Sequence, residues 1–138
     1  MVVAQLLYGG SPVALTGNTD LTLLTLAERT ATVNTADQTA YYARGVYVYL
    51  VVTAITATPS IVLKIQLEIP NGDYITLLEA AAVTGTGTTV YLLHADAGAA
   101  AGDITKVVNY PIPLTWRVRV EHGDADAIEY EVYATVVV

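Results

Sequence analysis

Apolar and polar side chains alternate along much of the chain, which is the pattern of β-strands with one buried face. The segment 61–69 has Ile or Leu at every odd position, and its outward positions include Lys64 and Glu68. The segment 46–56 alternates between Val or Leu and Tyr-rich positions, so both of its faces are apolar or amphipathic, and we expect a central strand. With turns at 57–60 and at Asn71-Gly72, and a third strand over 74–78, the pattern predicts a three-stranded meander.

Residues 116–133 read as a β-hairpin. Trp116, Val118 and Val120 share one face of the first strand, and Ile128, Tyr130 and Val132 share one face of the second. A turn over 122–126 that brings Val120 opposite Ile128 would bring Arg119 opposite Glu129 and Arg117 opposite Glu131. We therefore expect two cross-strand ion pairs, each stabilising by about 0.2–1 kcal/mol.

The rest of the chain adds shorter elements. Strands are expected over 21–26, 29–33 and 89–93, a polar loop over 34–39, and an Ala- and Gly-rich loop over 95–104. Residues 1–12 end in Gly9-Gly10-Ser11-Pro12 and are expected to form an extended arm, followed by one domain over 13–138. The fold class is all-β: a single antiparallel β-sandwich, jelly-roll-like or barrel-like, with very little helix.

Composition changes how the surface is interpreted. The chain is 54% hydrophobic and only 14% charged, against about 25% charged in an average soluble domain. A net charge of −7 opposes binding to nucleic acid. The uncharged run 45–63 is long enough to span a membrane, but its β-branched residues, Tyr and Pro59 favour two strands instead. Few charges on a folded surface suggest that other subunits cover much of it.

The chain offers little chemistry for catalysis. It has no Cys, two His and two Ser, and neither Ser11 nor Ser60 stands in a nucleophile motif, so we expect neither an enzyme nor a small-molecule substrate. His122, Asp124 and Asp126 could ligate a divalent ion, but a turn uses Gly and Asp for backbone reasons, and we favour the turn. The segment 85–89 lacks the Lys of a phosphate-binding loop. No cofactor or metal is expected.

Tyrosines and the apolar N-terminus are the candidate interface. Tyrosine serves such contacts because its body is apolar and its tip is polar. The same tyrosines could stack on sugars, and that alternative stays open. The predicted interface residues are Val2, Val3, Leu6, Leu7, Tyr8, Tyr41, Tyr42, Tyr47 and Tyr49.

Several phrases after residue 36 resemble those of small head-associated virion proteins of tailed bacteriophages. They include Ala-Asp-Gln-Thr at 36–39, Ala-Arg-Gly-Val at 43–46, Tyr-Ile-Thr-Leu-Leu at 74–78 and Pro-Leu-Thr-Trp-Arg-Val-Arg-Val-Glu-His-Gly at 113–123. The resemblance covers about the last hundred residues and carries no catalytic motif. It implies a head decoration, or cement, protein that binds the outer capsid surface as an oligomer, often a trimer, in the virion.

The partners expected on this basis are further copies of the chain and the major capsid protein, with no nucleic acid and no membrane. Two alternatives remain open: a tail, spike or connector component, and a carbohydrate-binding β-sandwich.

Overall fold

The computed structural model describes residues 18–138, and every regular element in that range is a β-strand. The arm predicted over 1–12, with Val2, Val3, Leu6, Leu7 and Tyr8, lies outside the described residues. The strands are β1 Thr19–Arg29, β2 Val33–Asn34, β3 Gln38–Thr39, β4 Gly45–Ile55, β5 Ile61–Glu68, β6 Tyr74–Glu79, β7 Gly87–His94, β8 Ile104–Val108, β9 Thr115–His122 and β10 Ile128–Val137.

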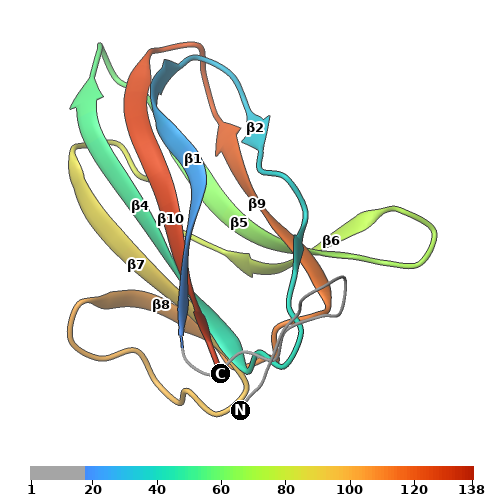
Figure 1. The fold of residues 1–138 in the computed structure, drawn as a ribbon. Coiled ribbons are helices and arrows are strands. Elements are labelled where there is room, and N and C mark those ends of the chain that lie inside the picture. Colours follow the sequence, from blue (N-terminus) through green and yellow to red (C-terminus); the bar gives the residue numbers. More distant parts are fainter. Residues whose placement is uncertain (1–17) are drawn as a thin grey trace.

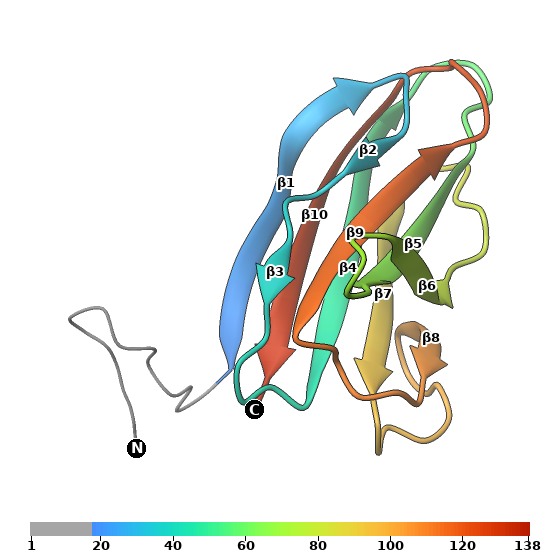
Figure 2. The ribbon, with the colours of Figure 1, turned by 90° about the vertical axis from the view of Figure 1, so that its right-hand side faces the viewer.

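The strands form two sheets that pack face to face (Figures 1 and 2). Sheet A has the order β1-β10-β4-β7-β8, and sheet B has the order β2-β9-β5-β6, with β3 also paired to β9. β2 and β3 can be treated as one interrupted strand, and β8 as an addition to the edge of sheet A. The remaining eight strands then have the strand order of a jelly roll, with β1-β10-β4-β7 in one sheet and β2/β3-β9-β5-β6 in the other. The predicted all-β sandwich is confirmed, in its jelly-roll form.

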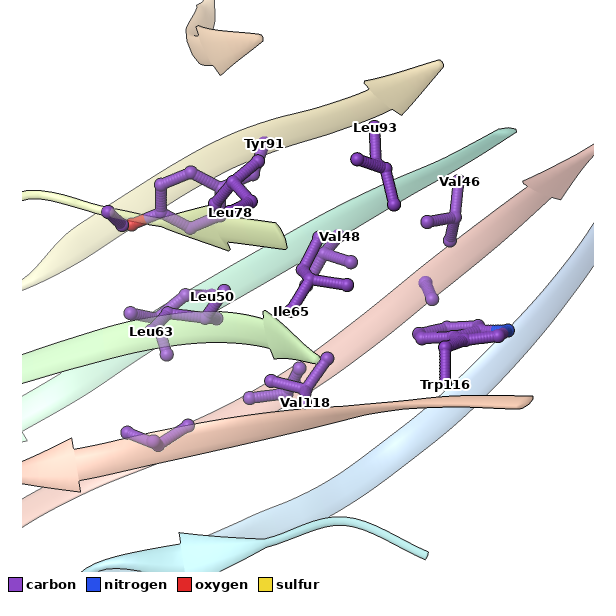
Figure 3. Packing of buried hydrophobic residues seen from close by; sticks show 14 of the residues in the cluster. Val46, Val48, Leu50, Leu63, Ile65, Leu78, Tyr91, Leu93, Trp116 and Val118 are labelled. Carbon is purple, nitrogen blue, oxygen red and sulfur yellow. The ribbon is translucent and has the colours of Figure 1, made fainter. Parts of the chain in front are cut away.

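The core lies between the sheets and consists of the inward residues of both (Figure 3). Trp116 of β9, Tyr91 of β7 and Tyr130 of β10 are the largest fully buried side chains. The residues predicted to share a face on β9 and on β10 are all buried: Trp116, Val118, Val120, Ile128, Tyr130 and Val132. Of the β4 residues predicted to share one face, Val46, Val48, Leu50 and Val52 are buried, whereas Ala54 is exposed.

The predicted C-terminal hairpin is wrong, because β9 and β10 belong to different sheets. Val120 pairs with Leu63 and Val33, while Ile128 pairs with Ile55 and Arg29. The turn over 122–126 therefore carries the chain from one sheet to the other.

The two predicted cross-strand ion pairs, Arg119–Glu129 and Arg117–Glu131, are also wrong, because their members lie on different sheets. Arg119 lies opposite Lys64 and Arg117 opposite Gln66, both in sheet B. In sheet A, Glu129 lies opposite Ala54 and Glu131 opposite Val51. Inward apolar residues on two facing sheets have the same sequence period as those on two paired strands, so alternation cannot tell the two arrangements apart.

The predicted meander is also only partly formed. β5 and β6 are a hairpin around the turn at 70–73, with a register shift between Ile65 and Gln66, but β4 lies in sheet A. Ala57, with φ of 62°, is part of the turn that crosses between the sheets. The predicted strand over 29–33 is not formed, because residues 30–32 connect the end of β1 at Arg29 to the start of β2 at Val33. Asn34 of β2 and both residues of β3 lie within the predicted loop 34–39, and β8 pairs in parallel with β7 where no strand was expected.

Candidate functional site

The outer face of sheet B carries a network of charged side chains. Lys64 Nζ lies 3.2 Å from Glu121 Oε1 and 3.8 Å from Glu79 Oε1, and Arg119 Nε lies 3.3 Å from Glu121 Oε2. The hydrogen bond from Lys64, followed by the one from Arg119, lowers the pKa of the Glu121 carboxyl. Charges that pair with one another in this way are typical of a face exposed to solvent.

A second polar group on this face surrounds Arg117. Its guanidinium lies over the ring of Tyr74, 3.4 Å from the centroid, and its Nε donates to Gln66 Oε1 at 2.9 Å. The Tyr74 hydroxyl donates to both carboxylate oxygens of Asp37, at 2.7 and 2.8 Å, and that hydrogen bond raises the pKa of Tyr74. Stacking and hydrogen bonds thus occupy the polar side chains here.

The outer face of sheet A has a different chemistry, which follows from its strand register. One row crosses all five strands as Thr22, Tyr133, Tyr49, Val90 and Ile104. The next row likewise runs through the five strands, as Asp20, Thr135, Tyr47, Leu92 and Val107. Neither row contains Lys or Arg. We call the residues of these two rows the tyrosine face.

Tyr47 and Tyr49 stand at the centre of the tyrosine face, because β4 is the middle strand of sheet A. Their rings are parallel to within 4°, with centroids 6.4 Å apart. The Tyr49 hydroxyl donates to Thr135 Oγ1 at 2.9 Å, and Thr135 Oγ1 donates to Asp20 Oδ1 at 2.8 Å. This chain of hydrogen bonds fixes one tyrosine tip to a carboxylate across three strands.

Two hollows lie on either side of this pair of rings. The first, of about 420 Å³, is lined by Asp20, Thr22, Tyr49, Tyr133 and Thr135, together with Leu21 and Ala134. The second, of about 350 Å³, is lined by Tyr47, Leu92 and His94, by Ile104, Val107 and Val137, and by the Ala-rich loop after β7. The tyrosine face is therefore hollowed, with the rings between the hollows.

A third surface lies at one end of the sandwich, where β1, β4 and β9 begin and β7, β8 and β10 end (Figure 1). Tyr41, Tyr42, Tyr110 and Leu114 are each between 52% and 67% exposed there, and we call them the tyrosine end. The backbone hydrogen bond from Ala40 N to Leu114 O, 2.8 Å long, holds the two segments together. Beside Leu114 is a hollow of about 490 Å³, walled by the β5–β6 hairpin tip.

The opposite end of the sandwich is closed by polar contacts. The Asp126 carboxylate accepts hydrogen bonds from the backbone and the hydroxyl of Thr58, and Asp124 Oδ1 accepts from Asp126 N at 3.1 Å. His122 Nε2 lies 2.9 Å from the hydroxyl of Tyr130. The side chains considered as ion ligands therefore stabilise the turn, and in the range 18–138 no three His, Asp or Glu side chains gather in a metal-binding group.

Arg29 completes this end of the sandwich. Where the pairing of β1 with β10 is interrupted between Leu24 and Ala27, its Nη1 donates to the carbonyl of Tyr130 at 2.7 Å. Its guanidinium also lies 4.7 Å from the centroid of the Tyr130 ring. Burial raises the pKa of Tyr130 to about 12, with Arg29 acting in the opposite direction.

The structure separates the tyrosines that the sequence groups together. Tyr47 and Tyr49 lie on the tyrosine face, whereas Tyr41 and Tyr42 belong to the tyrosine end. The sequence interpretation missed Tyr133, Tyr110 and Leu114. Tyr133 could have been found from its outward position in the alternating segment 128–137. Tyr110 and Leu114 lack such a signal, since Pro111 and Pro113 interrupt any period.

Comparisons with known proteins bear on the fold. No protein-family model matches the chain, and no curated protein sequence matches it. No helix in the described part of the chain is long and apolar enough to cross a membrane. Among solved structures, the chain is similar to the crystal structure of SPBc2 prophage-derived protein YomS, with 13% identity and a TM-score of 0.52 over 88% of this chain and 93% of that one. This similarity shows that the two chains share a fold.

Proposed function

We propose that the chain is a structural protein of a tailed-phage particle, and specifically a head decoration protein. In this role it binds the outer surface of the capsid as a homotrimer and stabilises the shell. It acts by binding, without a cofactor and without catalysis, and its location is the virion. The prophage origin of the similar structure and the resemblance of the segments after residue 36 support the phage context.

The observation that carries the proposal is the tyrosine end. Four of the seven large apolar side chains that are exposed among the described residues gather there: Tyr41, Tyr42, Tyr110 and Leu114. Tyrosine is enriched at protein interfaces. A partner that covers such a patch removes its apolar area from water, which favours binding by about 25 cal/mol per Å². Many copies on one shell would make weak single contacts sufficient.

The first test is the molar mass in solution, measured by light scattering coupled to size exclusion. A trimer has three times the chain mass of 14.6 kDa. Leu114→Ser should lower the assembled fraction or the binding to capsids. Leu26→Ser is the matched control, because Leu26 is an exposed leucine, 48% accessible, on β1 and away from the tyrosine end.

The second test locates the protein in the particle. Labelled antibody seen by electron microscopy should cover the shell, and heads prepared without the protein should bind it when it is added back. Labelling confined to the tail would favour the tail, spike or connector alternative. A chain that is monomeric and does not bind heads would refute the decoration role.

A further inference from the structure

We propose that the tyrosine face of sheet A binds a neutral oligosaccharide across Tyr47, Tyr49 and Tyr133. The proposal concerns a surface distinct from the tyrosine end, and it does not depend on the decoration role. Its basis is the coincidence of a central pair of aromatic rings, two hollows beside them and a carboxylate fixed at the rim.

The rings provide the apolar part of such a site. A sugar ring has a C–H face that packs on an aromatic side chain, while its hydroxyls need hydrogen-bond partners around it. Tyr47, Tyr49 and Tyr133 are all only half-buried, and each ring belongs to the lining of one of the two hollows. Tyrosine suits this contact because the ring is apolar and the hydroxyl bonds to polar groups.

The polar part of the site is already in position. The hydrogen bonds from Tyr49 to Thr135 and from Thr135 to Asp20 hold the Asp20 carboxylate at the edge of the first hollow. The Tyr133 hydroxyl likewise donates to the Glu131 carboxylate. Ionised carboxylates are strong acceptors for hydroxyl donors, and groups held in place before binding lose little freedom when the ligand arrives.

The charges determine which sugars fit. Asp20 and Glu131 are acidic, the two rows contain no Lys or Arg, and the whole chain carries a net charge of −7. Phosphorylated, sialylated or uronic sugars would therefore be repelled, and a neutral sugar would not be. A second copy packed symmetrically on this face would bring its own Asp20 and Glu131 against these, which disfavours a homodimer here.

The sizes of the hollows set the length of the ligand. Small-ligand sites usually occupy about 300–1,000 Å³. Hollows of about 420 and 350 Å³ on the two sides of the ring pair each have room for a short stretch of sugar rings. A linear oligosaccharide lying across β10, β4 and β7 would fill both hollows and cover the tyrosines between them.

The test begins with an array of immobilised oligosaccharides in which neutral glucans, mannans, galactans and N-acetylglucosamine oligomers stand beside sialylated and uronic ones. The best neutral binder is then titrated into the ¹⁵N-labelled full chain and followed by NMR. We expect shifts at residues of β4, β7 and β10, and no binding of the acidic sugars. Failure of every neutral sugar to bind at about 10 mM would overturn the proposal.

Variants assign the binding to this face. Tyr49→Ala should weaken binding about tenfold or more, and Asp20→Asn, which keeps the shape of an exposed side chain, should weaken it without affecting the fold. Tyr42→Ala is the control, since Tyr42 is an exposed tyrosine at the tyrosine end. Loss of binding in Tyr42→Ala alone would overturn the assignment. A change of oligomer mass in Tyr49→Ala, in the absence of any sugar binding, would also overturn the proposal, because the tyrosine face would then be an interface between copies of the chain.

Discussion

Replacing Lys64 and Glu121 by Ala, singly and together, measures the ion pair at the centre of the outer face of sheet B. Their charged atoms are 3.2 Å apart, and the side chains are 17% and 40% exposed. Coulomb's law gives about 1.3 kcal/mol for this separation in water and about 5 kcal/mol at an effective dielectric constant of about 20. Desolvation and side-chain ordering oppose this gain, so we expect a coupling energy of about 0.5–1 kcal/mol.

The assay is urea unfolding of the four proteins of the cycle. Trp116 is the only tryptophan and is fully buried, so its fluorescence reports the loss of the core. In about 1 M salt the Debye length falls to about 3 Å, and the coupling should shrink accordingly.

A second cycle, with Arg119→Ala and Glu129→Ala, is the control for topology. These residues lie on different sheets, so their coupling should be zero to within about 0.3–0.5 kcal/mol. A clear coupling between Arg119 and Glu129, together with none between Lys64 and Glu121, would mean that β9 and β10 form a hairpin and would refute the jelly-roll arrangement.

Three further predictions concern stability. Gly45→Ala should destabilise by about 1–3 kcal/mol, because the new Cβ would lie 2.5 Å from the carbonyl oxygen of Leu93; an unchanged melting temperature would contradict this. Glu28→Lys should stabilise by about 0.2–1 kcal/mol in urea unfolding, since Glu28 lies opposite Glu129 and like charges become an opposite pair. Burial lowers the pKa of His122 below 6.5, so the unfolded chain binds more protons and stability should fall as the pH drops through about 6.5; His122→Gln should reduce this slope, and an unchanged slope would contradict the cause.

Sequence alternation assigned most faces, since the residues grouped on one face of β9 and of β10 are all buried, as are Val46, Val48, Leu50 and Val52 of β4. It was insufficient to assign partners. The segment 122–126 reads as a hairpin turn, but backbone hydrogen bonds from Gly123 N to Ser60 O and from Thr56 N to Ala127 O join the connection between β9 and β10 to the turn after β4. Such contacts link residues far apart in the chain, and no local pattern encodes them.

The candidate surfaces show the same division. The outward direction of Tyr47 and Tyr49 follows from the period of two along β4. That Tyr133 and Thr135 lie beside them depends on the register of β10 against β4. The tyrosine end depends on two loops meeting through Ala40 and Leu114, which only the assembled sandwich brings together.

The place of β10 in sheet A determines when the chain can fold. This last strand lies between β1 and β4, the first and fourth strands, so Thr19 must find Val136 across almost the whole described chain. Pairing over such sequence separations folds slowly, because loop closure precedes any gain from contact. During synthesis, sheet A cannot close until Ile128–Val137 has left the ribosome. Until then β1 and β4 lack their shared partner, and their apolar residues are open to aggregation with other nascent chains.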